Sequence, residues 1–205
     1  MSRRILAIDT TSECGSLALA DGGRVLEEVA LHSPDGFAHV IFGEIERLLA
    51  RHHLKITDIE GFAAAAGPGT FTGVRVGLTA VKGLAEATHR KVAAVSNLQA
   101  LASFGTRPLR APVIDARRGE IFGAVYDADL RLVCPEVVMK HEDWLQTVPG
   151  GDVEMITLAP EQLLAAAVAR IAAGRFEAGL VEDPAEIDAN YVRRSDAELM
   201  WRDKI

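Results

Sequence analysis

Two segments of this chain align with each other without a gap. They are "AIDTTSECGSLALAD" at residues 7–21 and "VIDARRGEIFGAVYD" at residues 113–127. In each, an apolar run ends at an aspartate, a polar turn follows, and a second apolar run ends at another aspartate. Self-similarity inside one chain is typical of a duplicated structural unit. A strand followed by a turn is also common, so a chance match is the alternative.

The elements expected after each segment occur in the same order. Each strand–turn–strand continues into a third strand, a helix, a strand and a helix, judged from apolar periodicity and turn residues. In the first half, we expect strands at 5–9, 15–20, 24–31, 61–66 and 91–95, and helices that open at 33–35, after Thr72 and near 98–104. In the second half, we expect a strand at 130–139, a helix containing Trp144, a strand at 155–158 and a helix at 161–173. This order predicts an α/β fold with mixed sheets flanked by helices.

The segment "GTRPLRAP" at residues 105–112 is typical of a joint between two halves, because it contains a glycine and two prolines. A chain of 205 residues can bury one good core or two small ones. We therefore expect an N-terminal domain at 1–106 and a C-terminal domain at 107–205. The second domain is shortened around 150–160, and its last segment can pack back on the first domain.

The composition favours a soluble, unprocessed protein of the cytoplasm. No apolar run approaches the roughly 18 to 20 residues that span a bilayer, and the N-terminus has no small-residue cleavage site. Cys14 and Cys134 have no partner at a metal-ligand spacing, which fits a reducing compartment. The net charge of -7 argues against a protein that binds nucleic acid by itself, because phosphate contacts rely on a basic surface.

The stretch "AAAAGPGTFTGVRVGLTAVKGLAEA" at residues 63–87 predicts an apolar strand, a glycine-rich turn and a helix. A Walker phosphate loop ends in Gly-Lys-Ser/Thr, but here Val74 and Arg75 follow the last glycine of the turn. Thr70 or Thr72 can cap the helix through its hydroxyl group. We therefore interpret the turn as a packing device rather than as a phosphate-binding loop.

The helix of this stretch has a narrow polar stripe. Its polar side chains fall within about 60° of one another around the helix axis, and they are Arg75, Thr79, Lys82 and Glu86. Gly73, Gly77 and Ala80 lie opposite, where missing side chains let another backbone approach closely. We expect one side of the helix to pack on its own sheet and the other side on a partner subunit. The alternative is that the sheet and the first helix of the same domain cover it completely.

Five groups of residues, spread over nearly the whole chain, resemble a known family in their identity and their order. They are Ile8-Asp9-Thr10-Thr11, His39, the run from Gly67 to Gly77, Asp115-Ala116-Arg117 with Glu120, and Tyr191-Val192-Arg193. The family is that of the bacterial TsaB proteins, and the glycine-rich run is the strongest part of the resemblance. The resemblance implies a duplicated fold of the actin-like, ribonuclease-H-like kind.

The resemblance also implies a function. TsaB proteins act with the transferase TsaD and the ATPase TsaE to form threonylcarbamoyladenosine next to the anticodon of tRNAs that read codons beginning with A. In that setting the chain is expected to be a non-catalytic scaffold that binds TsaD, helps to recruit TsaE and forms a homodimer when alone. It is expected to meet tRNA only indirectly, to bind no metal, and to bind ATP or ADP only at the joint with a partner.

The partner surface is expected on the helices of the N-terminal domain. The expected interface residues are Val40, Glu44, Gly69, Phe71, Thr72, Gly73, Val76, Gly77 and Ala80. The contrasting function is a stand-alone actin-like ATPase or small-molecule kinase, for which 205 residues leave little room.

Catalytic chemistry lacks its usual motifs in this sequence. There is no His-x-x-x-His pair to hold a metal ion from one helix face, and no Gly-x-Ser-x-Gly elbow for a nucleophile. Asp9, Thr10 and Thr11, with Asp115 in the second copy, stand where actin-like ATPases hold phosphate, but the first turn lacks glycine and the second has two arginines. We interpret these residues as a vestigial phosphate loop. The alternative is that both aspartates only hold their turns by accepting hydrogen bonds.

Overall fold

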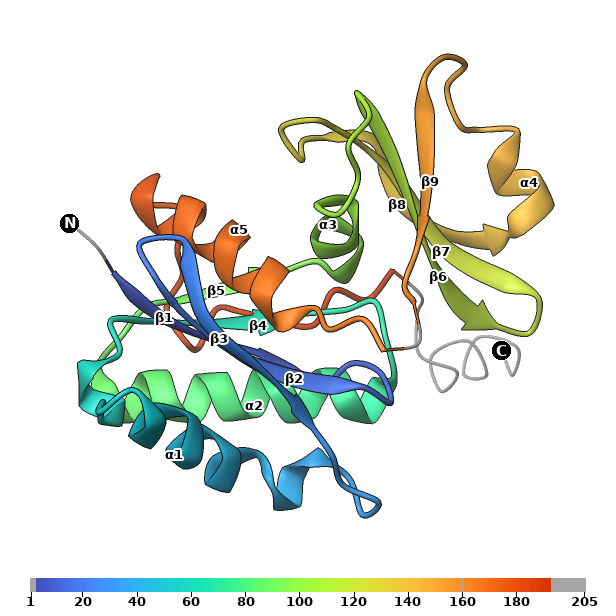
Figure 1. Cartoon of the computed structure of the whole chain (residues 1–205). Helices are drawn as coiled ribbons and strands as arrows, with labels where there is room; N and C mark the ends of the chain where they lie inside the picture. The colour runs from blue at the N-terminus through green and yellow to red at the C-terminus, as the bar shows by residue number, and fades with distance from the viewer. Residues whose placement is uncertain (1–2, 160, 193–205) are drawn as a thin grey trace.

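The computed structural model of the chain describes residues 3–159 and 161–192 (Figure 1). The first half forms β1 (Arg4–Asp9), β2 (Gly15–Asp21), β3 (Arg24–Leu31), η1 (Phe37–His39), α1 (Ile41–Arg51), η2 (Ile56–Asp58), β4 (Gly61–Ala65), α2 (Phe71–Thr88), β5 (Val92–Val95) and α3 (Asn97–Ala102). The second half forms β6 (Leu109–Arg117), β7 (Glu120–Asp127), β8 (Leu132–Lys140), α4 (His141–Leu145), β9 (Val153–Thr157) and α5 (Ala165–Glu177).

The strands form two mixed sheets with the same internal order. In the first sheet, β3-β2-β1-β4-β5, strand β1 is antiparallel to β2 and parallel to β4. In the second sheet, β8-β7-β6-β9, strand β6 is antiparallel to β7 and parallel to β9. Within the described residues, the second sheet has no counterpart of β5. The predicted α/β fold with mixed sheets flanked by helices is confirmed, and the self-similar segments are equivalent hairpins of the two sheets.

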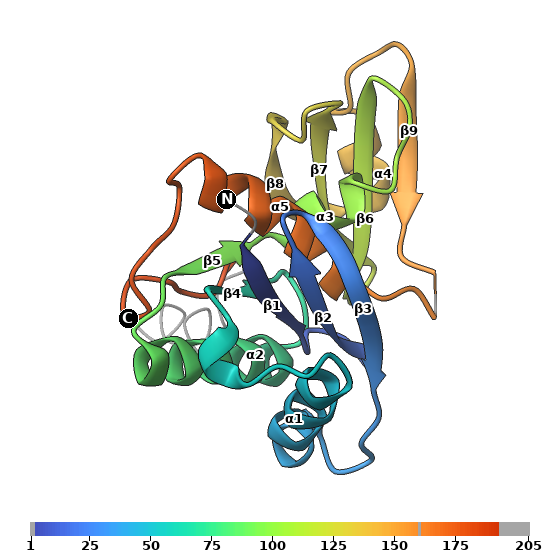
Figure 2. The ribbon, with the colours of Figure 1, turned by 60° about the vertical axis from the view of Figure 1, so that its left-hand side comes forward.

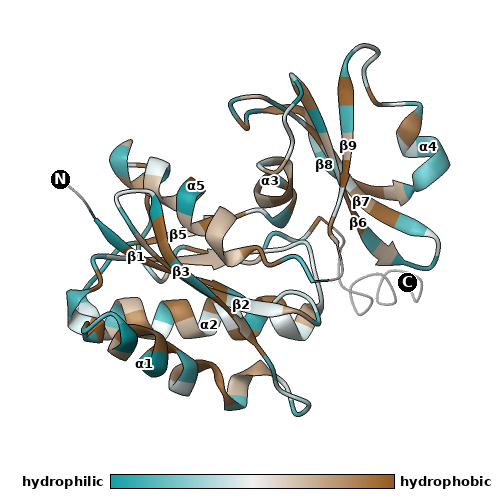
Figure 3. Ribbon diagram, in the orientation of Figure 1, coloured by the Kyte–Doolittle hydropathy of each residue, from teal (hydrophilic) through white to brown (hydrophobic). Residues whose placement is uncertain are grey.

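Helices cover both faces of the first sheet. α1 and α2 lie on one face and α5 lies on the other, whereas α3 lies between α5 and the second sheet (Figures 1 and 2). In β1, Leu6 and Ile8 belong to the core on the α1–α2 side, whereas Ile5 and Ala7 belong to the core under α5. A strand that is covered on both faces needs apolar residues at every position, and Figure 3 shows hydrophobic segments along the strands between the helix layers.

Helix α5 follows β9 in the chain but packs on the first sheet. Its buried face is rich in alanine, which lets it lie close to β1 and β2. The first sheet also caps it, because the N–H of Ala165 donates to Ser16 Oγ over 3.1 Å and the N–H of Ala166 donates to Glu28 Oε1 over 2.7 Å. This tertiary cap explains why the helix begins at residue 165 rather than at the predicted residue 161.

Two other expected boundaries are wrong. β6 begins at Leu109 and includes Pro112, which pairs with Ile156 of β9, so the end of segment 105–112 lies in a sheet rather than in a joint. The helix expected to open at 33–35 is preceded by the short η1 turn, and α1 itself begins at Ile41.

After α5, the chain returns along the outer edge of β5, and its last described residues reach the glycine-rich turn. Glu182 and Val92 exchange two backbone hydrogen bonds of 2.9 and 3.0 Å. Ile187 is buried in the core on the α1–α2 side, and the N–H of Asn190 donates to the carbonyl of Ala66 over 2.8 Å. We call residues 181–192 the C-terminal strap. Arg193, which carried part of the family resemblance, lies outside the described residues.

Candidate functional site

A cleft of about 810 Å³ opens between the two halves of the molecule. Its walls come from the turn after β1 (11–14), the end of β6 (115–117), the glycine-rich turn (68–71) and the end of the strap (189–192). The first two of these segments occupy equivalent positions in the two self-similar segments. The duplication therefore brings both hairpins to one cleft, which makes this the candidate functional site.

The two equivalent aspartates hold their turns in the same way. Asp9 Oδ1 accepts hydrogen bonds from the N–H of Thr11 over 2.9 Å and from Thr11 Oγ1 over 2.6 Å. Asp115 Oδ1 accepts from the N–H of Arg117 over 2.8 Å. Asp9 is fully buried, whereas Asp115 lines the cleft and is exposed. Burial raises the pKa of Asp9, and the hydrogen bonds from Thr11 only partly oppose this effect.

The hydroxyl groups beside Asp9 are bonded inside the chain. Thr10 Oγ1 donates to the carbonyl of Gly73 over 2.6 Å, and Thr11 Oγ1 accepts from Asn97 Nδ2 over 2.5 Å. Asn97 Oδ1 in turn accepts from the N–H of Gly67 over 3.1 Å. This buried network joins β1, the glycine-rich turn and α3. Asn97 was not among the predicted site residues. The sequence shows it only as a polar residue within an apolar stretch.

The glycines of α2 face the end of β1 in the same chain. A Cβ atom at Gly73 would lie 2.0 Å from the carbonyl oxygen of Thr10, and one at Gly77 would lie 2.8 Å from Thr10 Oγ1. A Cβ atom at Gly69 would lie 2.6 Å from the carbonyl oxygen of Thr11. These contacts correct the interpretation that Gly73 and Gly77 admit the helix of another subunit. The missing side chains do allow close approach, but the backbone that approaches is that of residues 10–11.

The N-terminus of α2 lies at the mouth of the cleft. Thr70, rather than Thr72, is its cap, because Thr70 Oγ1 accepts from the N–H of Gly73 over 3.3 Å. The guanidinium group of Arg75 lies 3.6 Å from the centre of the Phe71 ring, and Arg75 Nε donates to Tyr191 Oη over 3.2 Å. Helix α2 is thus connected both to the cleft and to the strap.

The outer faces of α1 and α2 expose apolar side chains. Phe42 on α1 is 55% exposed, and Phe71 at the start of α2 is 51% exposed. Of the expected interface residues, Gly69, Phe71 and Thr72 are exposed, Val40, Glu44 and Val76 are half-buried, and Gly73, Gly77 and Ala80 are buried. The structure therefore leaves the first six of these residues accessible and covers the last three with the chain itself.

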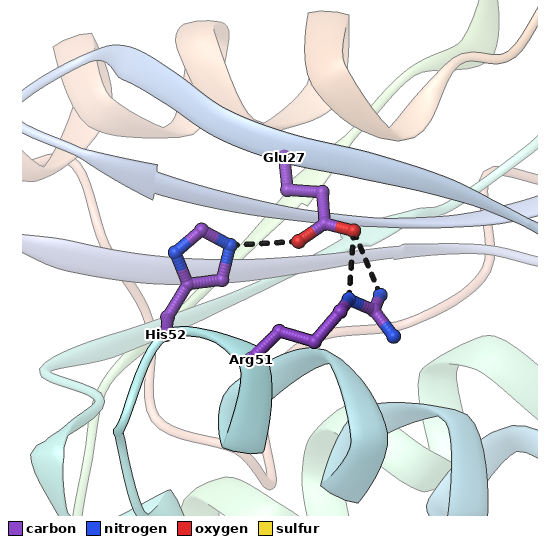
Figure 4. Close-up of polar contacts among 3 residues, drawn as sticks. All are labelled: Glu27, Arg51 and His52. Carbon is purple, nitrogen blue, oxygen red and sulfur yellow. Dashed lines mark hydrogen bonds and ion pairs between the residues drawn. The ribbon is translucent and has the colours of Figure 1, made fainter.

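An ionic cluster fixes the C-terminal end of α1 to the edge strand β3 (Figure 4). Glu27 on β3 accepts from Arg51 Nε over 2.9 Å and lies 2.7 Å from His52 Nε2. Arg51 Nη2 lies 2.8 Å from the same oxygen, Glu27 Oε1, so one carboxylate oxygen contacts two nitrogen atoms of the guanidinium group. The hydrogen bond from Arg51 lowers the pKa of Glu27. The cluster holds α1 at a fixed position against the sheet.

A second polar cluster, also missed by sequence analysis, surrounds Glu136 on β8. Its carboxylate accepts hydrogen bonds from Tyr126, Ser96 and Asn190. Burial and the neighbouring carboxylate raise the pKa of Tyr126, so this phenol remains a proton donor. The pattern of apolar and polar residues along β8 gives no sign that the half-buried Glu136 carboxylate accepts these hydrogen bonds.

Residues 3–159 and 161–192 contain no group of three or more His, Cys, Asp or Glu side chains arranged to hold a metal ion. They also contain no helix long and apolar enough to cross a membrane.

The fold and the glycine-rich turn define a relative of the threonylcarbamoyl-transferase proteins. A family model described as "TsaD: tRNA N6-adenosine threonylcarbamoyltransferase" matches residues 33–177. Within this group, the chain is 30% identical over 165 residues to TsaB of Bacillus subtilis, covering 78% of this chain and 72% of the relative. It is 38% identical over 132 residues to TsaB of Escherichia coli, covering 62% of this chain and 56% of that relative. The chain belongs to the TsaB family, which confirms the resemblance found in the sequence.

A solved structure agrees with this assignment. YeaZ from Pseudomonas aeruginosa superimposes on the chain with a TM-score of 0.76 and 25% sequence identity. The match covers 92% of this chain and 99% of the solved chain. The whole two-sheet architecture is therefore shared with that protein.

Proposed function

We propose that this chain takes part in the biosynthesis of threonylcarbamoyladenosine in tRNA, as a non-catalytic subunit that binds a TsaD-type transferase. Membership of the TsaB family supports a role in this process, since the relatives of the chain are named for that biosynthesis. The non-catalytic role and the partners go beyond the family name. They rest on the geometry of the cleft and of the outer helices.

The observation that carries the non-catalytic role is the internal bonding at the end of β1. Asp9, Thr10 and Thr11 are at most 2% exposed, and each uses its side chain in a hydrogen bond within the chain. A phosphate group or its magnesium ion would need these same atoms. In addition, Gly73 of α2 and Gly69 of the preceding turn lie against the carbonyl groups of Thr10 and Thr11.

The outer faces of α1 and α2 are the proposed docking surface for the TsaD-type partner. The TsaD family model matches this chain over the region that contains both helices, so the partner is expected to present helices of the same kind. Related folds commonly pair through the same surface on both subunits. The accessible residues of this surface are Val40, Phe42, Glu44, Phe71, Thr72 and Val76. The same surface would form a homodimer when the chain is alone, and recruitment of a TsaE-type ATPase would follow docking.

One feature favours a second candidate, a stand-alone actin-like ATPase or small-molecule kinase. The cleft volume of about 810 Å³ lies within the range of ordinary ligand pockets. Calorimetric titration of the isolated chain with Mg-ATP separates the two candidates. The scaffold role predicts no tight site in this chain, whereas micromolar binding would favour the kinase.

The decisive experiment is reconstitution of threonylcarbamoyl transfer to tRNA from purified TsaD- and TsaE-type proteins of the same genome. Product is expected to depend on the addition of this chain. Equal product without it would overturn the scaffold role. A Phe42→Glu variant, altered only on the outer face of α1, serves as the matched test of docking.

A further inference from the structure

Glu136 stands where three segments of the chain meet. Its Oε1 accepts from Tyr126 Oη over 2.5 Å and from Ser96 Oγ. Its Oε2 accepts from Asn190 Nδ2 over 2.5 Å. Tyr126 belongs to the same sheet as Glu136, but Ser96 directly follows β5 of the first sheet and Asn190 belongs to the C-terminal strap. Two of the three hydrogen bonds therefore join the second sheet to segments that are held to the first sheet.

The contact continues beyond Glu136 to the glycine-rich turn. The backbone N–H of Asn190 donates to Ala66 O over 2.8 Å, and Asn190 Nδ2 also lies 3.4 Å from Gly67 O. The next residue, Tyr191, accepts the hydrogen bond from Arg75 of α2. A continuous path of hydrogen bonds thus runs from β8 through the strap to the first turns of α2.

The position of this path bears on the cleft. One wall of the cleft is carried by the second sheet, at residues 115–117 and Phe122, and the opposite wall by residues 11–14 and 68–71. The distance between the walls depends on how the two sheets are held together. Hydrogen bonds to an ionised carboxylate are about twice as strong as neutral ones, so Glu136 is well suited to hold them.

We propose that Glu136 and Asn190 form an interdomain latch. The latch fixes the width of the cleft and couples it to the conformation of the glycine-rich turn at the start of α2. A ligand or partner that changes the conformation of the turn would then change the width of the cleft. A ligand that changes the width of the cleft would likewise change the turn, because coupling between two sites is reciprocal. The latch is a property of the isolated chain and does not depend on the proposed function.

The test is amide hydrogen exchange, read by NMR on the isolated full chain. The variants are Glu136→Ala, Asn190→Ala and the double variant, with Glu142→Ala on the exposed surface of α4 as the matched control. The reporter amides are those of residues 190 and 67. The N–H of Gly67 donates to Asn97 and not to Glu136 or Asn190, so a change there in Glu136→Ala, which leaves Asn190 in place beside the carbonyl of Gly67, reports coupling.

Exchange at both amides is expected to rise about tenfold or more in Asn190→Ala, the effect of losing one charge-assisted hydrogen bond, and at least as much in Glu136→Ala, which loses three. The double variant should exchange no faster than the faster single variant, and Glu142→Ala should match the wild type. Small-angle scattering should show a larger radius of gyration for the latch variants.

Two results would overturn the latch. One is an unchanged exchange rate at the Gly67 amide in variants that unfold at a lower denaturant concentration than the wild type. This result would show that Glu136 and Asn190 only stabilise the fold. The other is additive effects of the two substitutions, which would show that they act independently. If Glu136→Ala fails to fold, Asn190→Ala decides by the same two amides, since its side chain lies on the strap and not within a sheet.

Discussion

Thr10 Oγ1 donates a hydrogen bond to the carbonyl oxygen of Gly73 over 2.6 Å, between residues 63 positions apart in the chain. The contact brings the end of the first strand against the first turn of α2. It also bonds the Thr10 hydroxyl group within the chain. The same contact explains the glycine at position 73 and supports the proposed non-catalytic role.

Substitution of Gly73 by alanine is expected to destabilise the fold. The new methyl group would lie 2.0 Å from the carbonyl oxygen of Thr10, and a backbone atom cannot move away without shifting β1 or α2. We expect a loss of about 1–3 kcal/mol or more in the free energy of unfolding, measured in urea. Gly83→Ala is the matched control, since it lies in the same helix with nothing within 4 Å of the new Cβ, and it should raise stability by up to about 1 kcal/mol. Equal effects of the two substitutions would contradict the packing argument.

Asp9 is expected to make stability fall as the pH rises. Burial raises its pKa above the ordinary 3.8, so the folded chain binds this proton more tightly than the unfolded chain does. The destabilisation is absent well below pH 3.8 and is complete above the raised pKa of the folded state. The stability of Asp9→Asn relative to wild type should therefore increase across this range and then level off. Urea unfolding at a series of pH values measures it, with Glu46→Gln on the exposed side of α1 as the control.

The cluster of Glu27 with Arg51 and His52 is expected to contribute little stability. The cluster is partly exposed, and such pairs contribute roughly 0–1 kcal/mol. Because the pKa of Glu27 is lowered from 4.5, its contribution is present above pH 4.5 and is lost as the pH falls through the lowered value. Glu27→Gln should therefore cost less than about 1 kcal/mol at neutral pH, and less still in high salt. A loss of stability that does not change with salt would show that packing, not charge, is at work.

Phe42→Glu is expected to weaken association with the TsaD-type partner at least tenfold while leaving the chain folded. Phe42 is 55% exposed, so the change removes an apolar contact of the proposed docking surface without opening the core. Leu145→Glu is the matched control. Leu145 is 48% exposed, but it lies on α4, which packs on the second sheet, away from the proposed docking surface. Size-exclusion chromatography and calorimetry with the purified partner measure the effect. Equal weakening by both variants would place the contact elsewhere.

Gly77, which the sequence predicts at the partner surface, is not a suitable site for that experiment. The structure shows why this choice fails, since a side chain at Gly77 meets Thr10 Oγ1 at 2.8 Å and would disturb the monomer itself. A test of docking needs residues whose side chains face outward, and only the folded chain shows which these are.

Much of the fold was predictable from the sequence. β1 is apolar at Ile5 to Ile8 because both of its faces are covered, and the hairpins end where aspartates and glycines permit turns. The paired aspartates, Asp9 and Asp115, were recognised as equivalent, and the alternative that they hold turns describes their hydrogen bonds. The family was recognised as well, because the glycine-rich run is specific.

The sequence by itself determined the order of the elements, the duplication of the hairpins and the absence of a Walker lysine after Gly73. These are local properties, set by periodicity, turn chemistry and residue identity. Only the tertiary structure decided that α2 packs against Thr10, that α5 returns to the first sheet, and that Glu136 joins the second sheet to the strap. A small or polar residue within an apolar stretch of the sequence indicates a close contact or a hydrogen bond at that position. Which neighbour it meets depends on contacts between residues far apart in the chain, and those are set only when the sheets pack.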